Sequence, residues 1–219
     1  MFRMTKNAVL YERPSIGVAP VSLEDKSRYA NNGTHNNITL SRMASGLWVR
    51  NFDGTNSYVN CGAATQANFT NDSFTLMGWL YATDIGAAHM VMCQGVTDVD
   101  GWQFFIFTNN VSARTCQGGS HSDVSAVGVF NLFRWTFVVL TRVGVTGQFY
   151  VNGSAVTTIG AFADAVSVVG GNELHIGCQN NVILNMWYGS LSGLRIYKCA
   201  VPADQVYRTW ESERRWYGL

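Results

Sequence analysis

Short runs of apolar, β-branched and aromatic residues alternate with clusters of glycine, asparagine, aspartate and serine along most of the chain. This pattern is typical of an all-β protein, because such runs fit a pleated sheet and the polar clusters form the turns between strands. The predicted strands are Leu47–Phe52, Ser57–Asn60, Phe74–Tyr81, His89–Gln94, Trp102–Thr108, Val111–Gln117, Trp135–Val143, Gly147–Val151, Glu173–Gly177 and Ser190–Tyr197.

Two segments predict specific local structures. Asn152-Gly153 lies between two apolar runs and predicts a two-residue hairpin turn, since both residues tolerate the positive φ values of such a turn. Pro202–Trp216 predicts a helix, because proline suits a first helical turn and Val206 and Trp210 recur four residues apart.

The runs FTLMGWLY and WTFVVLT are apolar on both faces. Strict alternation would mark a sheet with one wet face. These runs therefore predict central strands that are covered on both sides or that meet a partner. With neither a linker nor a repeat in view, we predict one domain with three parts: a docking segment or first strand over 1–22, a β-sandwich over 23–201, and a helix and tail over 202–219.

Composition narrows the class of protein. The chain has 219 residues, a formal net charge of +1, and 13% charged residues, about half of the roughly 25% of an average globular chain. Few charges and many aromatic residues exclude a disordered protein. The near-zero charge argues against a nucleic-acid partner, which needs clustered basic residues, and no apolar run approaches the ~20 residues that span a membrane.

Five cysteines are present, and the odd number leaves at least one unpaired. Most lie in apolar runs, so we expect buried free thiols that pack as small hydrophobic groups. The first 22 residues lack the continuous apolar core of a signal peptide, since Glu12, Arg13 and Pro14 interrupt it. We therefore expect synthesis in a cytoplasm without a signal peptide.

Six motifs in order resemble a known family. They are DKSRYANNGT (25–34), FDGTNSYVNCG (52–62), SFTLMGWLY (73–81), WTFVVLTRVGVTGQFYVNG (135–153), LHIGCQ (174–179) and YGSLSGLRIYKCAV (188–201). Together they are similar to laminin-G-like domains of the concanavalin A-like lectin/glucanase superfamily. The resemblance implies an all-β fold, a two-sheet antiparallel jelly-roll sandwich, followed by a short C-terminal helix.

Some relatives of this fold are glycoside hydrolases that carry an E-x-D-x-x-E strand motif, and this sequence has no such motif. Asp98 and Asp100 have strand spacing, but their neighbours predict a turn. Ser120–Asp123 contains serine, histidine and aspartate, which we interpret as a loop because a catalytic triad is assembled across a fold. The sequence thus predicts no enzyme, with a glycosidase or lyase as the least favoured alternative.

The resemblance also raises the question of calcium. Relatives often hold a structural ion near the opening acidic loop and near an aspartate of the penultimate strand, where this chain has Ser192. Asp25 and Asp53 remain as candidate ligands, since calcium prefers several hard oxygen ligands from loops. The alternative for Asp25 is that it caps its own loop. We expect no cofactor, with structural calcium left open.

Two binding functions compete. The first is a structural or decoration protein on a virion, of the kind made by bacteriophages, because an outward-facing recognition fold without a signal peptide suits a particle assembled in the cytoplasm. It would dock on other virion proteins through Met1–Pro20 and Arg208–Leu219, in repeated copies on a symmetric assembly, and would lie on the virion surface. A cytoplasmic or non-classically exported protein is the alternative.

The second function is a carbohydrate-binding, lectin-like module, on its own or on the same particle. Aromatic rings and amides are the groups that hold sugars. The candidate glycan-binding residues lie in and around the asparagine-rich loop and on one predicted strand: Trp102, Asn180, Asn181, Asn185, Trp187 and Tyr188. An ordinary polar turn is the alternative interpretation of that loop.

Overall fold

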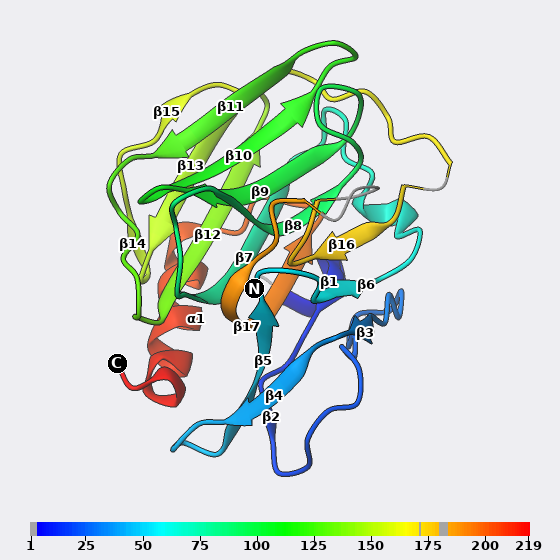
Figure 1. The fold of residues 1–219 in the computed structure, drawn as a ribbon. Helices are drawn as coiled ribbons and strands as arrows, with labels where there is room; N and C mark the ends of the chain where they lie inside the picture. The colour runs from blue at the N-terminus through cyan, green and yellow to red at the C-terminus, as the bar shows by residue number, and fades with distance from the viewer. Residues whose placement is uncertain (1–3, 171, 180–183) are drawn as a thin grey trace.

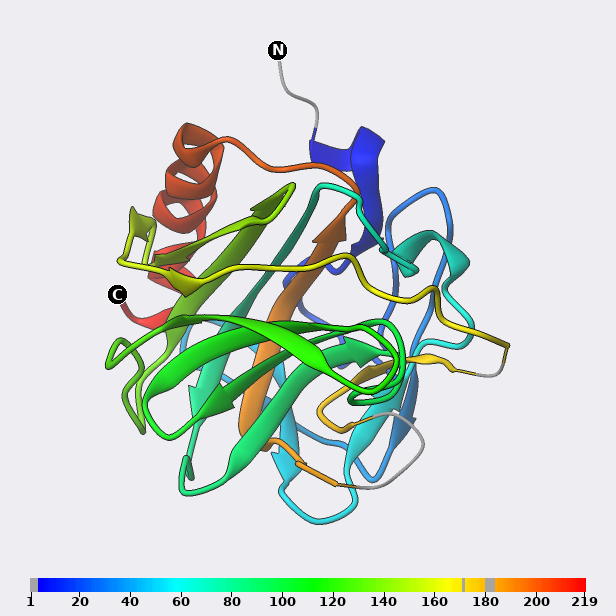
Figure 2. The ribbon, with the colours of Figure 1, turned by 90° about the horizontal axis from the view of Figure 1, so that it is seen from above.

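The computed structural model describes residues 4–170, 172–179 and 184–219. These residues form two antiparallel β-sheets that pack face to face, with one α-helix near the C-terminal end (Figures 1 and 2). The predicted jelly-roll sandwich with a short C-terminal helix is confirmed.

The first sheet contains the strands that are apolar on both faces. Its order is β14 (Ser154–Ala155), β13 (Thr146–Val151), β12 (Thr136–Val143), β7 (Phe74–Ala82), β17 (Tyr188–Tyr197), β5 (Leu47–Asp53) and β2 (Ser15–Ile16). In addition, β1 (Ala8–Tyr11) pairs with β17, and β4 (Thr39–Arg42) pairs with β5.

The second sheet has the order β15 (Ile159–Gly160), β11 (His121–Ala126), β10 (Asn110–Cys116), β9 (Trp102–Phe107), β8 (Ala88–Gln94), β16 (Leu174–Ile176), β6 (Tyr58–Asn60) and β3 (Thr34–Asn36). The helical elements are η1 (Met4–Asn7), η2 (Thr65–Ala67), α1 (Ala203–Glu213) and η3 (Arg214–Tyr217). Among the described residues, no helix is both long enough and apolar enough to cross a bilayer.

All ten predicted strands are present, each within about two residues of its predicted ends. The interpretation of Ser120–Asp123 as a loop was wrong, because residues 121–126 form strand β11. The turn at Asn152-Gly153 is confirmed, with φ values of 49° and 79°. The predicted helix is divided into α1 and η3.

The space between the sheets holds the main hydrophobic core. Trp102, Phe104 and Ile106 alternate along β9 and all point inward, as a strand period of two requires. Phe69 stacks on Phe74 with ring centroids 4.9 Å apart and lies 6.0 Å from the ring of Trp102. The core is thus built from large aromatic side chains of both sheets.

All five cysteines are free thiols, as expected from the sequence, and four of them are buried. Burial raises the pKa of Cys61 and Cys178 to about 12 and that of Cys116 to about 11. Only Cys199 is partly exposed. The sandwich therefore holds together without a disulfide staple among its described residues.

The outer face of the first sheet is covered by the C-terminal segment, which Figure 2 shows on the side away from the second sheet. Tyr217 of η3 stacks on Trp79 of β7 with centroids 4.0 Å apart, and Trp79 Nε1 donates a 2.9 Å hydrogen bond to Glu213. At the hairpin, a Cβ on Gly153 would lie 2.9 Å from the ring of Trp210 in α1. These contacts explain why strands of this sheet are apolar on both faces.

Candidate functional site

The outer face of the second sheet is the surface that the reader sees in Figure 1. No helix covers it among the described residues. Side chains alternate along β9, so Gln103 and Phe105 point outward between the inward residues of the core. Gln103 and Asp123 both lie opposite Arg114 in the strand register, which brings one residue from each of three neighbouring strands together on this face.

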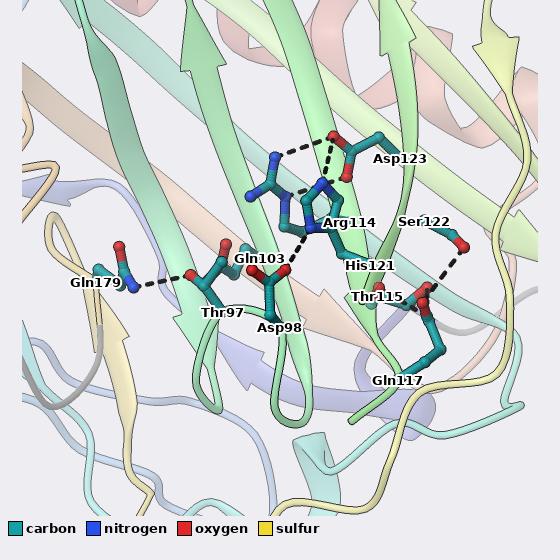
Figure 3. Close-up of polar contacts among 10 residues, drawn as sticks. All are labelled: Thr97, Asp98, Gln103, Arg114, Thr115, Gln117, His121, Ser122, Asp123 and Gln179. Carbon is teal, nitrogen blue, oxygen red and sulfur yellow. Dashed lines mark hydrogen bonds and ion pairs between the residues drawn. The ribbon is translucent and has the colours of Figure 1, made fainter. Parts of the chain in front are cut away.

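Arg114 is held in place by two contacts. Its guanidinium donates hydrogen bonds from Nε to Asp123 Oδ1 (3.1 Å) and from Nη2 to Asp123 Oδ2 (3.0 Å), as Figure 3 shows. The same guanidinium lies 4.7 Å from the centroid of the Phe105 ring. A fork of two hydrogen bonds and a cation–π contact fix the orientation of the group at the surface.

His121 connects this pair to the turn between β8 and β9. Its Nδ1 contacts Asp98 Oδ1, and its Nε2 lies 3.8 Å from Asp123 Oδ2. Asp98 adopts a φ of 64°, a left-handed conformation that aspartate and asparagine tolerate better than most residues. Ser122 donates a 3.4 Å hydrogen bond to Gln117 and not to His121 (Figure 3).

Thr97 joins the turn to two amide side chains. Gln103 Nε2 donates to Thr97 Oγ1 at 2.6 Å, and Gln179 Nε2 donates to the same oxygen at 2.8 Å. Gln179 lies after β16, at the start of the asparagine-rich loop, and its Oε1 accepts a 2.7 Å hydrogen bond from Asn185. Seven of the residues drawn in Figure 3 are called the polar cluster below: Thr97, Asp98, Gln103, Arg114, His121, Asp123 and Gln179. The predicted asparagine-rich loop borders this cluster through Gln179.

The prediction that Trp102 and Trp187 bind a glycan is wrong, because both side chains are buried. Trp102 is 1% exposed and Trp187 is 0% exposed, and both lie in the core between the sheets. Trp102 also donates its Nε1 hydrogen to Ala67 O at 2.7 Å. Neither ring can offer a face to a ligand from solvent.

The other predicted glycan-binding residues are scattered. Asn185 is exposed beside Gln179, at the border of the polar cluster. Tyr188 is 46% exposed, but it belongs to β17 of the first sheet, where it lies opposite Asp53. Asn180 and Asn181 fall outside the described residues.

The two candidate calcium ligands organise turns. Asp25 is buried and accepts hydrogen bonds from the backbone N–H groups of Tyr11, Ser27 and Asn31 at 2.7–2.8 Å. Within the described ranges, no group of three or more His, Cys, Asp or Glu residues could hold a metal ion. The structure thus gives Asp25 the loop-capping role that was the alternative to calcium.

Asp53 has the same kind of role. Its Oδ1 accepts hydrogen bonds from the hydroxyl of Ser57 and from the backbone N–H groups of Thr55, Asn56 and Ser57. These hydrogen bonds, that of the Ser57 hydroxyl above all, lower the pKa of Asp53 to about 2. The Asp53 carboxylate therefore stabilises the turn formed by residues 53–57.

A pocket of about 410 Å³ opens at the other end of the second sheet, where β3 forms the edge. Its lining includes Asn32, Thr34, Asn36, Tyr58, Asn60 and Glu173. The sequence analysis missed these residues, because they come from three separate segments that only the sheet brings together. The outward parity of Tyr58 and Asn60 around buried Val59 was the available signal.

The match to a family model decides the relationship. Residues 53–207 match the Laminin_G_3 family, described as the concanavalin A-like lectin/glucanases superfamily. The chain belongs to this superfamily. A comparison with curated proteins finds no match.

Solved structures similar to this superfamily member include binding domains of clostridial toxins. The binding domain of Paraclostridial Mosquitocidal Protein 1 has a TM-score of 0.73 and 15% identity, over 99% of this chain and 56% of that chain. The binding domain of botulinum neurotoxin serotype G has a TM-score of 0.69 and 14% identity, over 94% and 51%. At such identities the likeness shows the fold alone.

A third similar structure comes from botulinum neurotoxin type C, whose cell entry depends on interaction with two ganglioside molecules. Its TM-score is 0.67 at 14% identity, over 95% of this chain and 52% of that chain. This superfamily member thus spans about half the length of each of these chains.

Proposed function

We propose that this protein is a non-enzymatic carbohydrate-binding, lectin-like module that holds a glycan on the outer face of its second sheet. The polar cluster is the observation that carries this proposal. It places amide, guanidinium, hydroxyl and carboxylate groups side by side on three strands and a turn, with Gln103 buried and the charged groups partly exposed to solvent. Such a surface can both donate hydrogen bonds to sugar hydroxyls and accept hydrogen bonds from them.

The geometry of the cluster suits recognition. Arg114 and Asp123 have side-chain exposures of 19% and 36%, so they are reachable but restrained by each other. A restrained group loses little conformational entropy when a ligand binds. Membership of a superfamily that contains lectins supports the same class of function.

The virion role predicted from the sequence is tested neither by the structure nor by the comparisons. The C-terminal segment proposed as a docking element packs on the chain's own first sheet, where Trp210, Trp216 and Tyr217 join one hydrophobic cluster. Docking on another protein and a virion location therefore remain predictions of the sequence alone.

A glycan array tests the proposed function. Asp98→Asn keeps the shape and the backbone tolerance of the turn but removes the charge that His121 contacts, and Gln179→Ala removes one amide of the cluster. We expect each variant to bind the glycans that the wild type selects at least about tenfold more weakly, equivalent to about 1.4 kcal/mol.

Arg208→Ala is the matched control, because this side chain is 75% exposed on α1, far from the cluster. It is expected to bind like the wild type. If the wild type binds no glycan, the proposed function is wrong. If it binds and neither cluster variant weakens binding, the glycan is held elsewhere on the molecule.

A further inference from the structure

Apolar side chains are exposed on the segment that runs on from the end of β2, at the lower end of the molecule in Figure 1. Val18 is 87% exposed and Val21 is 92% exposed, the two highest values for a large apolar side chain among the described residues. Ile16 is 51% exposed, and residues 15–23 include no charged one. We call residues 16–21 the apolar loop. Single exposed apolar residues are normal, but a contiguous group of them marks an interaction site.

Hydrogen bonds hold the backbone of the apolar loop in place. Trp48 Nε1 donates a 2.8 Å hydrogen bond to Gly17 O, and the Ser15 hydroxyl donates to Val18 O at 3.4 Å. The loop begins in β2, which pairs with β5. The valine side chains therefore project from an anchored backbone, and a partner that covers them does not have to order the loop first.

Two further segments lie beside the apolar loop, and each carries an arginine next to a tryptophan. In one, the guanidinium of Arg42 lies 6.0 Å from the centroid of the half-buried Trp48 ring. In the other, the guanidinium of Arg215 lies 5.4 Å from the centroid of the Trp216 ring. Trp216 O accepts a 2.6 Å hydrogen bond from Ser45 of the β4–β5 turn. The apolar loop, this turn and η3 thus form one surface, which we call the lower edge (Figure 1).

Three arginines at the lower edge have no carboxylate partner. Arg13, Arg42 and Arg215 are exposed, and none of them forms an ion pair within the part of the chain that the structure describes. Arg13 lines a pocket of about 260 Å³ together with Ile16 and Pro20 of the apolar loop. A guanidinium group binds phosphate oxygens through parallel hydrogen bonds, and here it is available beside apolar side chains.

The glutamates of the neighbouring segments are already paired with cations of their own. Each pair is neutral, and Asp25 is buried against backbone N–H groups. The three arginines therefore give the lower edge an excess of positive charge, which favours a negatively charged partner. The pairs are Glu12–Arg50, Glu24–Lys26, Glu211–Arg214 and Glu213–Arg195.

The surface of an anionic lipid bilayer matches both properties of the lower edge. Valine side chains that protrude from a loop can enter a fluid apolar phase, whereas a protein partner would need a concave surface shaped to them. Tryptophan is enriched at the boundary between hydrocarbon and headgroups, and arginine keeps its stem in apolar surroundings while its charge stays outside them. Anionic headgroups attract basic residues near the bilayer surface.

We propose that the lower edge docks on an anionic bilayer surface, with Val18 and Val21 at the boundary between headgroups and acyl chains. Arg13, Arg42 and Arg215 contact the lipid phosphates. The contact is peripheral, because only a loop enters the bilayer. This inference goes beyond the proposed function and does not rest on it, since β9, β10 and β11, which carry most of the polar cluster, lie toward the upper end of the molecule in Figure 1.

Co-sedimentation with vesicles tests the apolar contact. The probes are vesicles of phosphatidylcholine alone and vesicles that also contain about 30% phosphatidylglycerol. Neither contains a glycolipid, so the result is independent of glycan binding. We expect the whole chain to bind the anionic vesicles at least about tenfold more tightly than the neutral ones, and the double variant Val18→Ser, Val21→Ser to lose at least about tenfold in affinity.

Val145→Ser is the matched control for the double variant, because this valine is 60% exposed in the turn between β12 and β13. It is expected to bind the anionic vesicles like the wild type. Thermal unfolding verifies that each variant is folded.

A second set of variants tests the charge contact. Arg13→Gln and Arg215→Gln remove guanidinium groups that form no hydrogen bond within the described ranges. Each is expected to weaken binding to the anionic vesicles about fivefold and to reduce the dependence of binding on salt. Arg208→Gln is the control, because its parent side chain is 75% exposed on α1.

Three results would overturn the proposal. The first is a wild type that binds neither kind of vesicle. The second is equal binding by the wild type and the double valine variant, which would show that the apolar loop does not enter the bilayer. The third is a dimer, seen by sedimentation velocity without vesicles, that the double valine variant dissociates; the loop would then be a contact between two copies of this chain. None of these results decides whether the polar cluster binds a glycan, which the glycan array measures separately.

Discussion

The two outer faces of this sandwich have opposite characters. On the first sheet, η3 and α1 cover an apolar face, and Trp79 is fully buried beneath Tyr217. On the second sheet, Arg114, His121 and Asp123 remain partly exposed, and the pocket at the β3 edge opens at the other end of the same sheet. The first face is therefore closed by packing within the chain, whereas the second face keeps charged side chains in contact with solvent.

The largest effect is expected where the covered face is anchored. Trp79→Ala removes the stack on Tyr217, the 5.0 Å contact with Phe137 and the hydrogen bond to Glu213. The free energy of unfolding should fall by about 3–5 kcal/mol, as for other buried tryptophans. Urea denaturation measures it. The control is Phe107→Ala on the second sheet, 49% exposed, for which we expect less than about 1 kcal/mol. Equal losses would contradict the comparison.

The next effect concerns a buried ion pair under the helix. Arg195 is 1% exposed and is paired with Glu213, so Glu213→Gln leaves its charge buried without a counter-ion. Breaking such a pair typically costs about 3 kcal/mol or more. Denaturation of this variant should therefore begin at clearly lower urea than that of Glu211→Gln, whose parent side chain is 44% exposed. An unchanged midpoint would show that the helix covers the sheet without this pair.

A smaller effect links the two sheets and depends on pH. His35 of β3 accepts a 2.8 Å hydrogen bond from Arg50 of β5. Burial, and secondarily the positive charge of Arg50, lowers the pKa of His35 from 6.5 to about 4. The neutral ring is thus favoured in the folded state, so its contribution to stability is complete above pH 6.5 and is lost as the pH falls from 6.5 toward 4.

The expected loss is about 1–2 kcal/mol, less than the full shift would give, because the ring is only partly buried. Urea denaturation at a series of pH values measures it. His35→Gln keeps an acceptor and does not titrate, so its stability should change less in this window. Asp53 loses its contribution only below about pH 3.8, outside the same window. Parallel curves for wild type and variant would refute this assignment.

The smallest effect is expected on the open face. Asp98→Asn should change the free energy of unfolding by less than about 0.5 kcal/mol, since the side chain is 51% exposed and its turn accepts asparagine. The same variant is expected to weaken glycan binding, as argued above. Weaker binding with unchanged stability would support the division between the two faces. A large loss of stability would contradict it.

The pattern of apolar and polar residues predicted the two-sheet architecture, because buried positions recur along a strand with a regular spacing. Phe74–Ala82 is apolar on both faces, since one face meets the core and the other meets the helix. Strand β11 was missed because only Val124 and Ala126 face inward, so its remaining residues resemble a polar loop. Polar strands give no such signal.

The site was less predictable, because it depends on side-chain direction and on contacts between distant segments. Trp102 shares its parity with Phe104 and Ile106, which places all three on one face; this parity was the sign that Trp102 is a core residue. Asp98 and His121 meet only because the β8–β9 turn lies beside β11. Nothing in the sequence alone specifies that proximity.

The rates at which the five cysteine thiols react can show which part of the molecule opens first. A thiol reacts as the thiolate, which burial suppresses at Cys61, Cys116 and Cys178. Cys199 is partly exposed, in the short connection between β17 and α1. An alkylating reagent should therefore modify Cys199 first, and the buried thiols only at the rate at which the sandwich opens. The order of labelling would record how the helix is released relative to the two sheets, without any engineered probe.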